Sequence, residues 1–158
     1  MAEPAFRSYC PLDRDGCLAV FDSNVPVYFM PRERAEFTGF LDRLPGPYLV
    51  AEEPSGTVVA CGGYAVNGET GIADMCWGMV TRSHHGRGIG KHLLRLRMEG
   101  AKQDPAVRLI QLITSQHTRE FYERQGFRLL SVEPDGFGPG LDQCKMEWQR
   151  PASGERSG

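Results

Sequence analysis

The sequence lacks a strong excess of charge of one sign. Its 18 Lys and Arg residues stand against 20 Asp and Glu residues, for a net charge of -2. Because a nucleic-acid-binding domain usually carries a basic excess, we expect no nucleic-acid partner. The chain also lacks any apolar run near the ~20 residues of a membrane-spanning helix, so we expect no membrane partner. Its first residues, MAEPAFRSYC, lack the basic start and apolar stretch of a signal peptide, which predicts a cytoplasmic protein.

Paired cysteines are lacking as well. The five cysteines are odd in number and scattered, and they form no C-x-x-C pair. They are Cys10, Cys17, Cys61, Cys76 and Cys144. This usage predicts reduced thiols, with neither a disulfide framework nor a zinc site. The histidines of the stretch HHG and His92 have no carboxylate or cysteine at ligand spacing, so we expect no metal.

Internal repeats and linkers are also missing, and 158 residues suit one compact domain. We therefore predict a single domain over residues 1–150. The remaining residues, 151–158, read PASGERSG and are small and polar, which is typical of a disordered tail.

Apolar periodicity and turn signals divide this domain into alternating strands and helices. Strands are predicted at residues 6–10, 47–53, 57–66, 72–80, 107–115, 127–133 and 144–149. Helices are predicted at 13–24, 31–44, 91–103 and 118–125. The order β-α-α-β-β-β-α-β-α-β-β indicates an α/β (α+β) fold in which helices flank a mixed sheet.

The stretch HHGRGIGKHLL, residues 84–94, joins a strand to a helix through three glycines. It is not a P-loop, because Gly86 and Gly90 are one residue too close and His92 stands where a hydroxyl should bind magnesium. It is not a dinucleotide fingerprint either, because Lys91 occupies the third glycine position.

The stretch nevertheless has the features of an anion-binding site. The first amides of a helix lack intrahelical partners and lie at the positive end of its dipole. Gly88 and Gly90 would let a pyrophosphate approach these amides, and Arg87 and Lys91 add positive charge. The alternative is that the glycines only form a turn into a basic, solvated helix, and the loop alone leaves both interpretations open.

Two motifs change this balance. MVTRSHHGRGIGKHLL resembles the acyl-CoA-binding motif of the GNAT superfamily of N-acetyltransferases. TSQHTREFYERQGF resembles the second signature of that superfamily, and one helix and one strand separate the two, as they do in the family. The resemblance implies a single GNAT-like domain with a mostly antiparallel sheet of about seven strands. Two positions depart from the family pattern, namely His85, where Gln or Arg is usual, and Ser115, where Asn is often found.

The resemblance also implies acetyl-CoA as co-substrate, with no metal. Pantetheine would lie between strands 72–80 and 107–115, which splay apart, and would bond to the main chain of Met79 and Val80. Pyrophosphate would bind to the amides from Gly86 to Lys91. The expected cofactor-binding residues are Met79, Val80, His85, Gly86, Arg87, Gly88, Ile89, Gly90, Lys91, Ser115 and Thr118.

Tyr122 stands at the position of the general acid in this family. A phenol is mostly protonated at neutral pH and can protonate the departing thiolate. Asp74 lies on strand 72–80, where several family members carry a glutamate base, and would act on the amine through a water. The alternatives are a structural aromatic residue for Tyr122 and a solvated strand-end residue for Asp74.

In this family the acceptor pocket is shaped by the first two helices and the loops near the last two strands. Here these correspond to residues 21–37 and 133–143, and the second segment is rich in glycine, which suggests mobility. The first segment contributes Phe21, Tyr28, Phe29, Met30, Asp22 and Glu33. This aromatic set with acidic neighbours suits an amine better than an anion.

Two functions are therefore weighed. The first is direct N-acetylation of a primary amine, on a small molecule or a peptide, in a ternary complex. The second is a non-catalytic acyl-CoA-binding regulatory module of the same fold, which would not need Tyr122. A covalent route through Cys76 and a histidine is disfavoured, because Cys76 lies on an apolar strand typical of the core. A homodimer is left open as the form of assembly.

Overall fold

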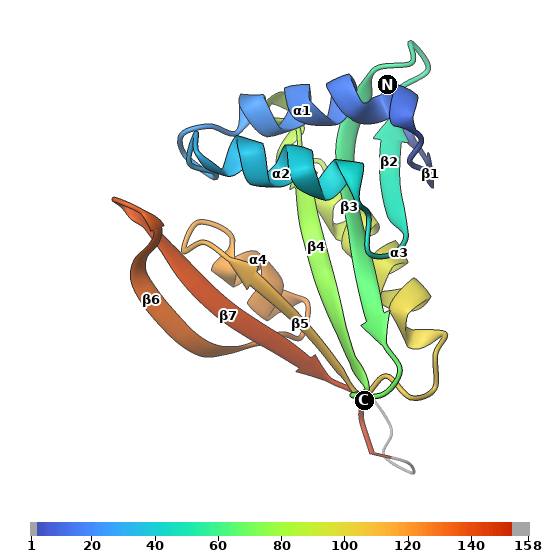
Figure 1. The fold of residues 1–158 in the computed structure, drawn as a ribbon, viewed down its shortest axis with the longest axis vertical. Helices are drawn as coiled ribbons and strands as arrows, with labels where there is room; N and C mark the ends of the chain where they lie inside the picture. Colours follow the sequence, from blue (N-terminus) through green and yellow to red (C-terminus); the bar gives the residue numbers. More distant parts are fainter. Residues whose placement is uncertain (1–2, 153–158) are drawn as a thin grey trace.

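A computed structural model describes residues 3–152 of the chain as a seven-stranded sheet flanked by helices (Figure 1). The strands are β1 (Ala5–Ser8), β2 (Tyr48–Glu52), β3 (Val58–Asn67), β4 (Ile72–Val80), β5 (Leu109–Thr114), β6 (Arg128–Gly138) and β7 (Leu141–Gln149). Their order across the sheet is β1-β2-β3-β4-β5-β7-β6. Among the strands of residues 3–152, only β4 and β5 pair in parallel, and every other pair is antiparallel. The predicted fold class is thus confirmed.

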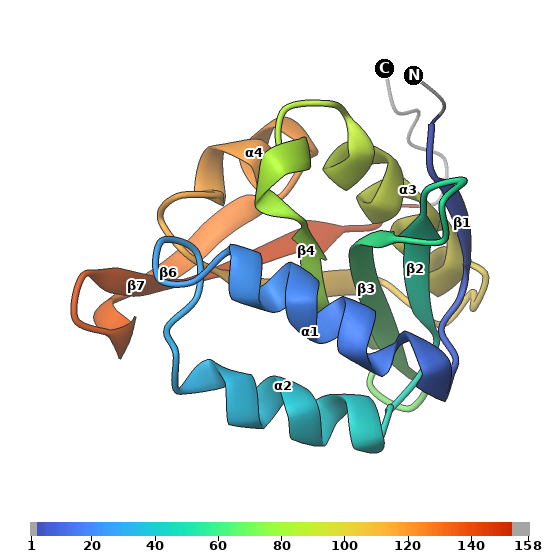
Figure 2. The ribbon, with the colours of Figure 1, turned by 90° about the horizontal axis from the view of Figure 1, so that it is seen from above.

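Helices cover both faces of the sheet (Figure 2). They are α1 (Arg14–Ser23), α2 (Glu33–Asp42), α3 (Ile89–Lys102) and α4 (Arg119–Arg124), with short 3-10 helices η1 (Pro11–Asp13) and η2 (Arg82–His84). Helices α1 and α2 lie on one face, and α3 and α4 lie on the other. The three longer helices, α1, α2 and α3, each bury apolar side chains against the sheet. On α3 these side chains form a stripe at helical spacing that includes Leu94, Met98 and Ala101.

Strands β4 and β5 form a fork, because they pair over only a short distance. The parallel pairing joins Ile72–Asp74 to Leu109–Gln111 and then stops. Beyond it the two strands diverge, which gives the molecule two arms (Figure 1). The first arm contains β1 to β4, and the second contains β5 to β7.

A β-bulge interrupts β4 within the diverging part. Met79 pairs with Cys61 and Cys76 pairs with Gly63, so Trp77 and Gly78 together oppose a single residue of β3. Trp77 has φ of 45°, which is unusual for a non-glycine residue and marks the local bend. The bulge therefore reshapes the strand at the depth where the two arms separate.

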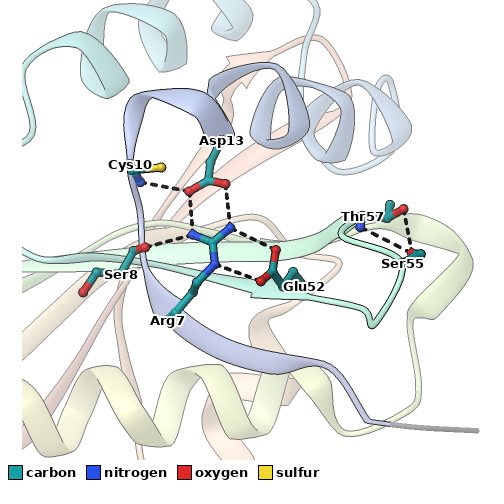
Figure 3. Close-up of polar contacts among 7 residues, drawn as sticks. All are labelled: Arg7, Ser8, Cys10, Asp13, Glu52, Ser55 and Thr57. Atoms are coloured by element: carbon teal, nitrogen blue, oxygen red, sulfur yellow. Dashed lines mark hydrogen bonds and ion pairs between the residues drawn. The ribbon is translucent and has the colours of Figure 1, made fainter.

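A charged cluster fastens the start of the chain to the first arm (Figure 3). The Arg7 guanidinium donates to both carboxylate oxygens of Asp13 at 2.8 Å and to those of Glu52 at 3.0 and 3.1 Å. Asp13 also accepts the Cys10 amide at 2.9 Å. The Arg7 guanidinium, as the main cause, lowers the pKa of Asp13 to about 2. The cluster thus joins β1, η1 and β2.

The last hairpin differs from its prediction. We expected a strand ending at residue 133 and a turn-rich loop after it, but β6 continues to Gly138. The reason is a bulged register between Glu133 and Gly138. There the Asp135 amide donates to Asp142 at 2.9 Å, and the Asp135 carboxylate accepts the Gly140 amide at 2.7 Å. These bonds extend the strand through residues that resemble a loop in sequence, so the predicted boundary was wrong.

Two expectations concern the ends and the helices of the chain. Of the predicted tail 151–158, residues 153–158 lie outside the described residues, while Pro151 and Ala152 are exposed and irregular. Among the helices of residues 3–152, none is both long enough and apolar enough to cross a bilayer.

Candidate active site

A large cleft occupies the space between the two arms. Its volume is about 1410 Å³, which exceeds the ~300–1,000 Å³ usual for one small-ligand pocket. Its walls come from β4, β5, the start of α3, α4 and the connection between α1 and α2. The cleft therefore has room for two ligands together.

The glycine loop forms one end of this cleft. Gly86 and Gly88 both have φ of 81°, in the left-handed region, and a Cβ at either would meet no atom within 4 Å. Gly88 caps α3 without a side-chain hydrogen bond. The first bond of the helix runs from the His92 amide to the Gly88 carbonyl, at 3.1 Å. The amides of residues 89–91 are thus available to an anion, with the positive end of the helix dipole behind them.

The side chains of this loop take different directions. Lys91 lines the cleft, whereas Arg87 lines a small separate hollow beside Glu53. His85 uses its Nε2 in a 2.8 Å hydrogen bond with the Val80 carbonyl, which leaves Nδ1 for a ligand. The side chain of Ile89 is buried, so only its backbone can serve.

Val80 and Met79 differ in the direction of their backbone groups. The Thr81 amide donates to Val59 of β3 at 2.7 Å. Because backbone groups alternate along an antiparallel strand, Met79 also faces β3, and Val80 faces the open side of the fork. There the Val80 carbonyl accepts Asn24 Nδ2 at 3.0 Å. Of the two residues predicted to hold pantetheine, only Val80 presents its backbone to the cleft.

Ser115 and Thr118 line the opposite wall. The Ser115 hydroxyl accepts the His117 amide at 3.3 Å, so it supports the turn that leads into α4. Thr118 Oγ1 interacts with the Ser115 carbonyl at 3.4 Å and with the Thr114 hydroxyl. Both hydroxyls therefore stabilise the turn at the edge of the cleft.

Tyr122 lies on α4 and is both packed and facing the cleft. Its ring meets the edges of Phe121 and Phe127, with centroids 5.0 and 5.8 Å away. The helix ends before Gly126, whose φ of 97° suits only glycine. The structural and the chemical interpretation of Tyr122 are thus compatible, because the packed ring holds the residue at the cleft wall.

Asp74 lies at the point where the fork opens. It forms the last paired position with Gln111 of β5, and Gln111 Nε2 donates to its Oδ1 at 2.6 Å. The residue is exposed and lines the same cleft as Tyr122. The structure therefore brings both predicted reacting residues to one cavity, from opposite arms.

The acceptor side is only partly as predicted. Phe21 is fully buried in the core, and Asp22 forms an ion pair with Arg34 at 2.9 Å. Tyr28, Phe29 and Glu33 line the cleft. Glu36, within the predicted segment 21–37, also lines the cleft, and so do Phe40 and Trp77, which sequence reasoning did not assign to the acceptor side.

Glu33 is the buried carboxylate of this side. It accepts the Met30 amide at 2.7 Å, and burial raises its pKa. Tyr28 lies between the two arms, with its ring 5.0 Å from that of His85 and 5.9 Å from that of His117. Because these contacts join residues far apart in sequence, no local pattern could have revealed them.

Arg97 on α3 was also missed. It lines the cleft and is only 3% exposed, so a charged side chain occupies a core-facing position. The signal was present in the sequence, since Arg97 falls within the stripe formed by Leu94, Met98 and Ala101.

The rival chemistries find little support. Within residues 3–152, no group of three or more His, Cys, Asp or Glu side chains could hold a metal ion. Burial raises the pKa of the Cys76 thiol, which disfavours the thiolate that a nucleophile needs.

Comparison with solved structures supports the fold. A ribosomal-protein-alanine N-acetyltransferase from Brucella melitensis is 21% identical with a TM-score of 0.71, covering 92% of this chain and 99% of its own. An N-acetyltransferase from Staphylococcus aureus is 17% identical, with a TM-score of 0.73 and coverages of 94% and 99%. An aminoglycoside 6'-N-acetyltransferase complexed with coenzyme A is 15% identical, with a TM-score of 0.74 and coverages of 93% and 99%.

No curated protein matches the sequence. A family profile does match, and its description is an acetyltransferase (GNAT) domain. The match spans residues 45–129, which is more than half of the chain and includes the bulged strand, the glycine loop and Tyr122. Together with the fork and the cleft, this match identifies the chain as a member of the GNAT family of acetyltransferases.

Proposed function

We propose that the protein transfers acetyl from acetyl-CoA directly to a primary amine, in a ternary complex. One observation carries the proposal: a single cleft has unpartnered helix-start amides at one end and Tyr122 and Asp74 along its walls. An anion-binding end and a pair of acid–base groups are what a phosphate-bearing acyl donor and an amine require.

The donor would enter from the glycine loop. Its pyrophosphate would bind the amides of residues 89–91, with Lys91 adding charge. Its pantetheine would extend along the open side of β4 at Val80, as an added strand would. Ser115 and Thr118 would border the pantetheine from the second arm. The aminoglycoside 6'-N-acetyltransferase of the same fold is a complex with coenzyme A, which supports a coenzyme A thioester as the donor.

The reaction would be a direct transfer. The amine nitrogen forms a bond to the thioester carbonyl carbon, and the carbon–sulfur bond then breaks with its electron pair on sulfur. Tyr122 gives its phenolic proton to sulfur, and Asp74 accepts the proton of the amine through a water. The Gln111 hydrogen bond orients the Asp74 carboxylate for this role.

The acceptor would be an amine that enters as a cation. Glu33, Glu36 and Asp74 supply carboxylates to the cleft, and the aromatic rings of Phe40 and Trp77 also line it. Aromatic faces with nearby carboxylates favour an alkylammonium group. Two of the similar structures are enzymes named for amine-bearing acceptors, an aminoglycoside and an alanine of a ribosomal protein. The free thiols of the five cysteines suit a reducing compartment such as the cytoplasm.

The test is a library of primary amines incubated with acetyl-CoA, with released thiol as the signal and mass spectrometry to identify the acetylated product. Reactions without amine correct for hydrolysis. We expect release with some cationic amines that carry an apolar or aromatic group. A protein that acetyl-CoA stabilises against heat but that acetylates no amine would instead be the acyl-CoA-binding module.

The donor end is tested separately by thermal unfolding. Acetyl-CoA should raise the melting temperature, because it binds the folded state. Dephospho-pantetheine lacks the pyrophosphate and should raise it much less. Equal stabilisation by both ligands would contradict the assignment of the pyrophosphate to the start of α3.

A further inference from the structure

Arg97 lies in a recess that glycines leave open behind β4. It is directed from α3 toward β3 and β4, and only 3% of it is exposed. A Cβ at Gly78 would overlap Arg97 Nη2, and one at Gly62 would lie 3.1 Å from Nε. Side chains at these two positions would displace the guanidinium, so the absence of side chains there makes room for it.

The charge of Arg97 is not compensated by any residue from 3 to 152. Nη1 donates to the Gly63 carbonyl at 3.4 Å, and Nε is buried without a hydrogen-bond partner. No ion pair formed within residues 3–152 includes Arg97. A buried cation without a counter-charge destabilises the fold, and an apolar side chain would fill the position at lower cost. The residue therefore points to an anion in the cleft that it lines.

The depth of Arg97 indicates which anion this is. Arg97 comes eight residues after Ile89, the first residue of α3, so it lies just over two turns, or about 12 Å, from the start of the helix. Gly78, against which the guanidinium lies, is two residues deeper in β4 than Val80. A pantetheine arm that begins at the glycine loop and passes Val80 brings its sulfur toward this level. The pyrophosphate stays at the loop and is too distant to pair with Arg97.

The charge of Arg97 also acts on a thiol of the protein, that of Cys76. Cys76 lines the same cleft. Burial and the Asp74 carboxylate raise the pKa of its thiol, whereas the Arg97 charge acts in the opposite direction. Arg97 is the smallest of these three influences on the pKa, but its sign is the one that favours a thiolate.

We propose that Arg97 stabilises the thiolate of coenzyme A as it leaves, an inference that rests on the proposed acetyl transfer. When the carbon–sulfur bond breaks, the electron pair remains on sulfur beside the guanidinium. The thiolate is then protonated by Tyr122, and the proton released by the amine returns to the phenolate through solvent. A fixed positive charge in a water-poor site stabilises such a developing anion without reorganisation.

The experiment measures binding and not turnover. Isothermal calorimetry gives the dissociation constants of coenzyme A and of desulfo-coenzyme A, which lacks the sulfur, from about pH 6 to about pH 9.5. This range spans the reference pKa of a thiol, ~8.5. If Arg97 lowers the pKa of the bound thiol by about one unit, the affinity for coenzyme A should rise about tenfold relative to that for desulfo-coenzyme A as the pH rises.

Variants of Arg97 test whether this pH-dependent gain in affinity comes from its charge. Arg97→Met removes the charge at similar length and should abolish the pH-dependent gain, while Arg97→Lys should retain part of it. Arg95→Met is the matched control, because Arg95 lies on the exposed face of the same helix and should leave the gain unchanged. Arg97→Gln takes the place of Arg97→Met if the latter does not fold.

The outcomes separate this inference from the proposed function. A parent protein that binds both ligands with a constant affinity ratio at every pH overturns the role of Arg97 without any variant, and acetyl transfer stands. A gain that persists in Arg97→Met also overturns it. Failure of the parent to bind either ligand would contradict the proposed function itself. A preference for carboxylate-bearing acyl-CoA that Arg97→Met abolishes would assign Arg97 to the acyl group and overturn the thiolate role.

Discussion

The two ends of the cleft are built from different parts of the chain. At the start of α3, the groups that can bind a ligand are mostly backbone amides, and two glycines with φ of 81° expose them. At the fork, the groups are the side chains of Asp74, Tyr122 and Arg97. The first end should thus control how tightly the donor binds, and the second should control how fast it reacts. Substitutions can test this division.

The largest effect is expected for Tyr122→Phe. The ring and its packing remain, but the acidic proton is lost, so kcat should fall by roughly 10²–10⁴. The affinity for coenzyme A and the melting temperature should stay close to those of the parent. The control is Tyr9→Phe, because Tyr9 packs on Tyr48, with centroids 5.7 Å apart, and does not line the cleft. Steady-state kinetics that give a parental kcat would remove Tyr122 from the reaction.

The next effect is expected for Asp74→Asn, and it should depend on pH. Without the base, the amine must lose its proton to solvent, so kcat/KM should fall on the order of 10² at neutral pH. The loss should become smaller as the pH approaches ~10.4, the reference pKa of an alkylamine. The control is Glu69→Gln, an exposed carboxylate in the turn before β4. If the variant's pH profile runs parallel to that of the parent, Asp74 is structural.

A smaller effect, and one on binding, is expected for Gly88→Val. The branched side chain is strained at φ of 81° and blocks the amides, so the Kd of coenzyme A should rise roughly ten- to hundredfold. Gly56→Val is the control, because Gly56 has φ of 91° and equally open surroundings but lies in the β2–β3 turn. Calorimetry should separate the two variants. Equal affinities in them would show that the loop glycines serve only the turn.

The smallest effect concerns stability and lies outside the cleft. The pKa of Asp13 is lowered from the usual 3.8 to about 2, so its ion pair stabilises the fold above about pH 4. This stability is lost as the pH falls toward 2. Asp13→Asn should reduce the change in the free energy of unfolding across this window by on the order of 1 kcal/mol, which thermal unfolding at several pH values would measure. Asp15→Asn should not, because Asp15 is an exposed residue in the first turn of α1. A parental pH dependence in Asp13→Asn would exclude this cluster as its source.

The difference between local motifs and contacts of distant segments explains which parts of the site the sequence could predict. The glycine loop and the helix of Tyr122 are local motifs, and β4 was predicted with its observed bounds, Ile72–Val80. The sequence places Arg97 within the apolar stripe of α3, but the recess that holds its guanidinium depends on Gly62 and Gly78 coming close to α3, so its role was not predicted. The contacts of Tyr28 with two histidines likewise join three separate segments.

The last hairpin shows a different limit. Residues 134–142 contain proline, aspartate and glycine, which are typical of loops. Side-chain bonds of Asp135 and Asp142 extend β6 through the first part of this segment. Gln116 strengthens the hairpin from outside, because its amide donates to the Gly140 carbonyl at 2.8 Å. Such bonds across the fold cannot be read from composition, so the boundary prediction failed there.

The short pairing of β4 with β5 has a consequence for solubility. A sheet normally has two outer edges, but the fork adds two inner ones, along Met75–Val80 and Leu112–Thr114. Exposed edges of this kind recruit strands from other molecules and lead to aggregation. Here they face each other inside a cleft, and the connection between α1 and α2 lines that cleft at Tyr28 and Phe29. The two inner edges thus face each other within one molecule, whereas the outer edges of the sheet are β1 and β6.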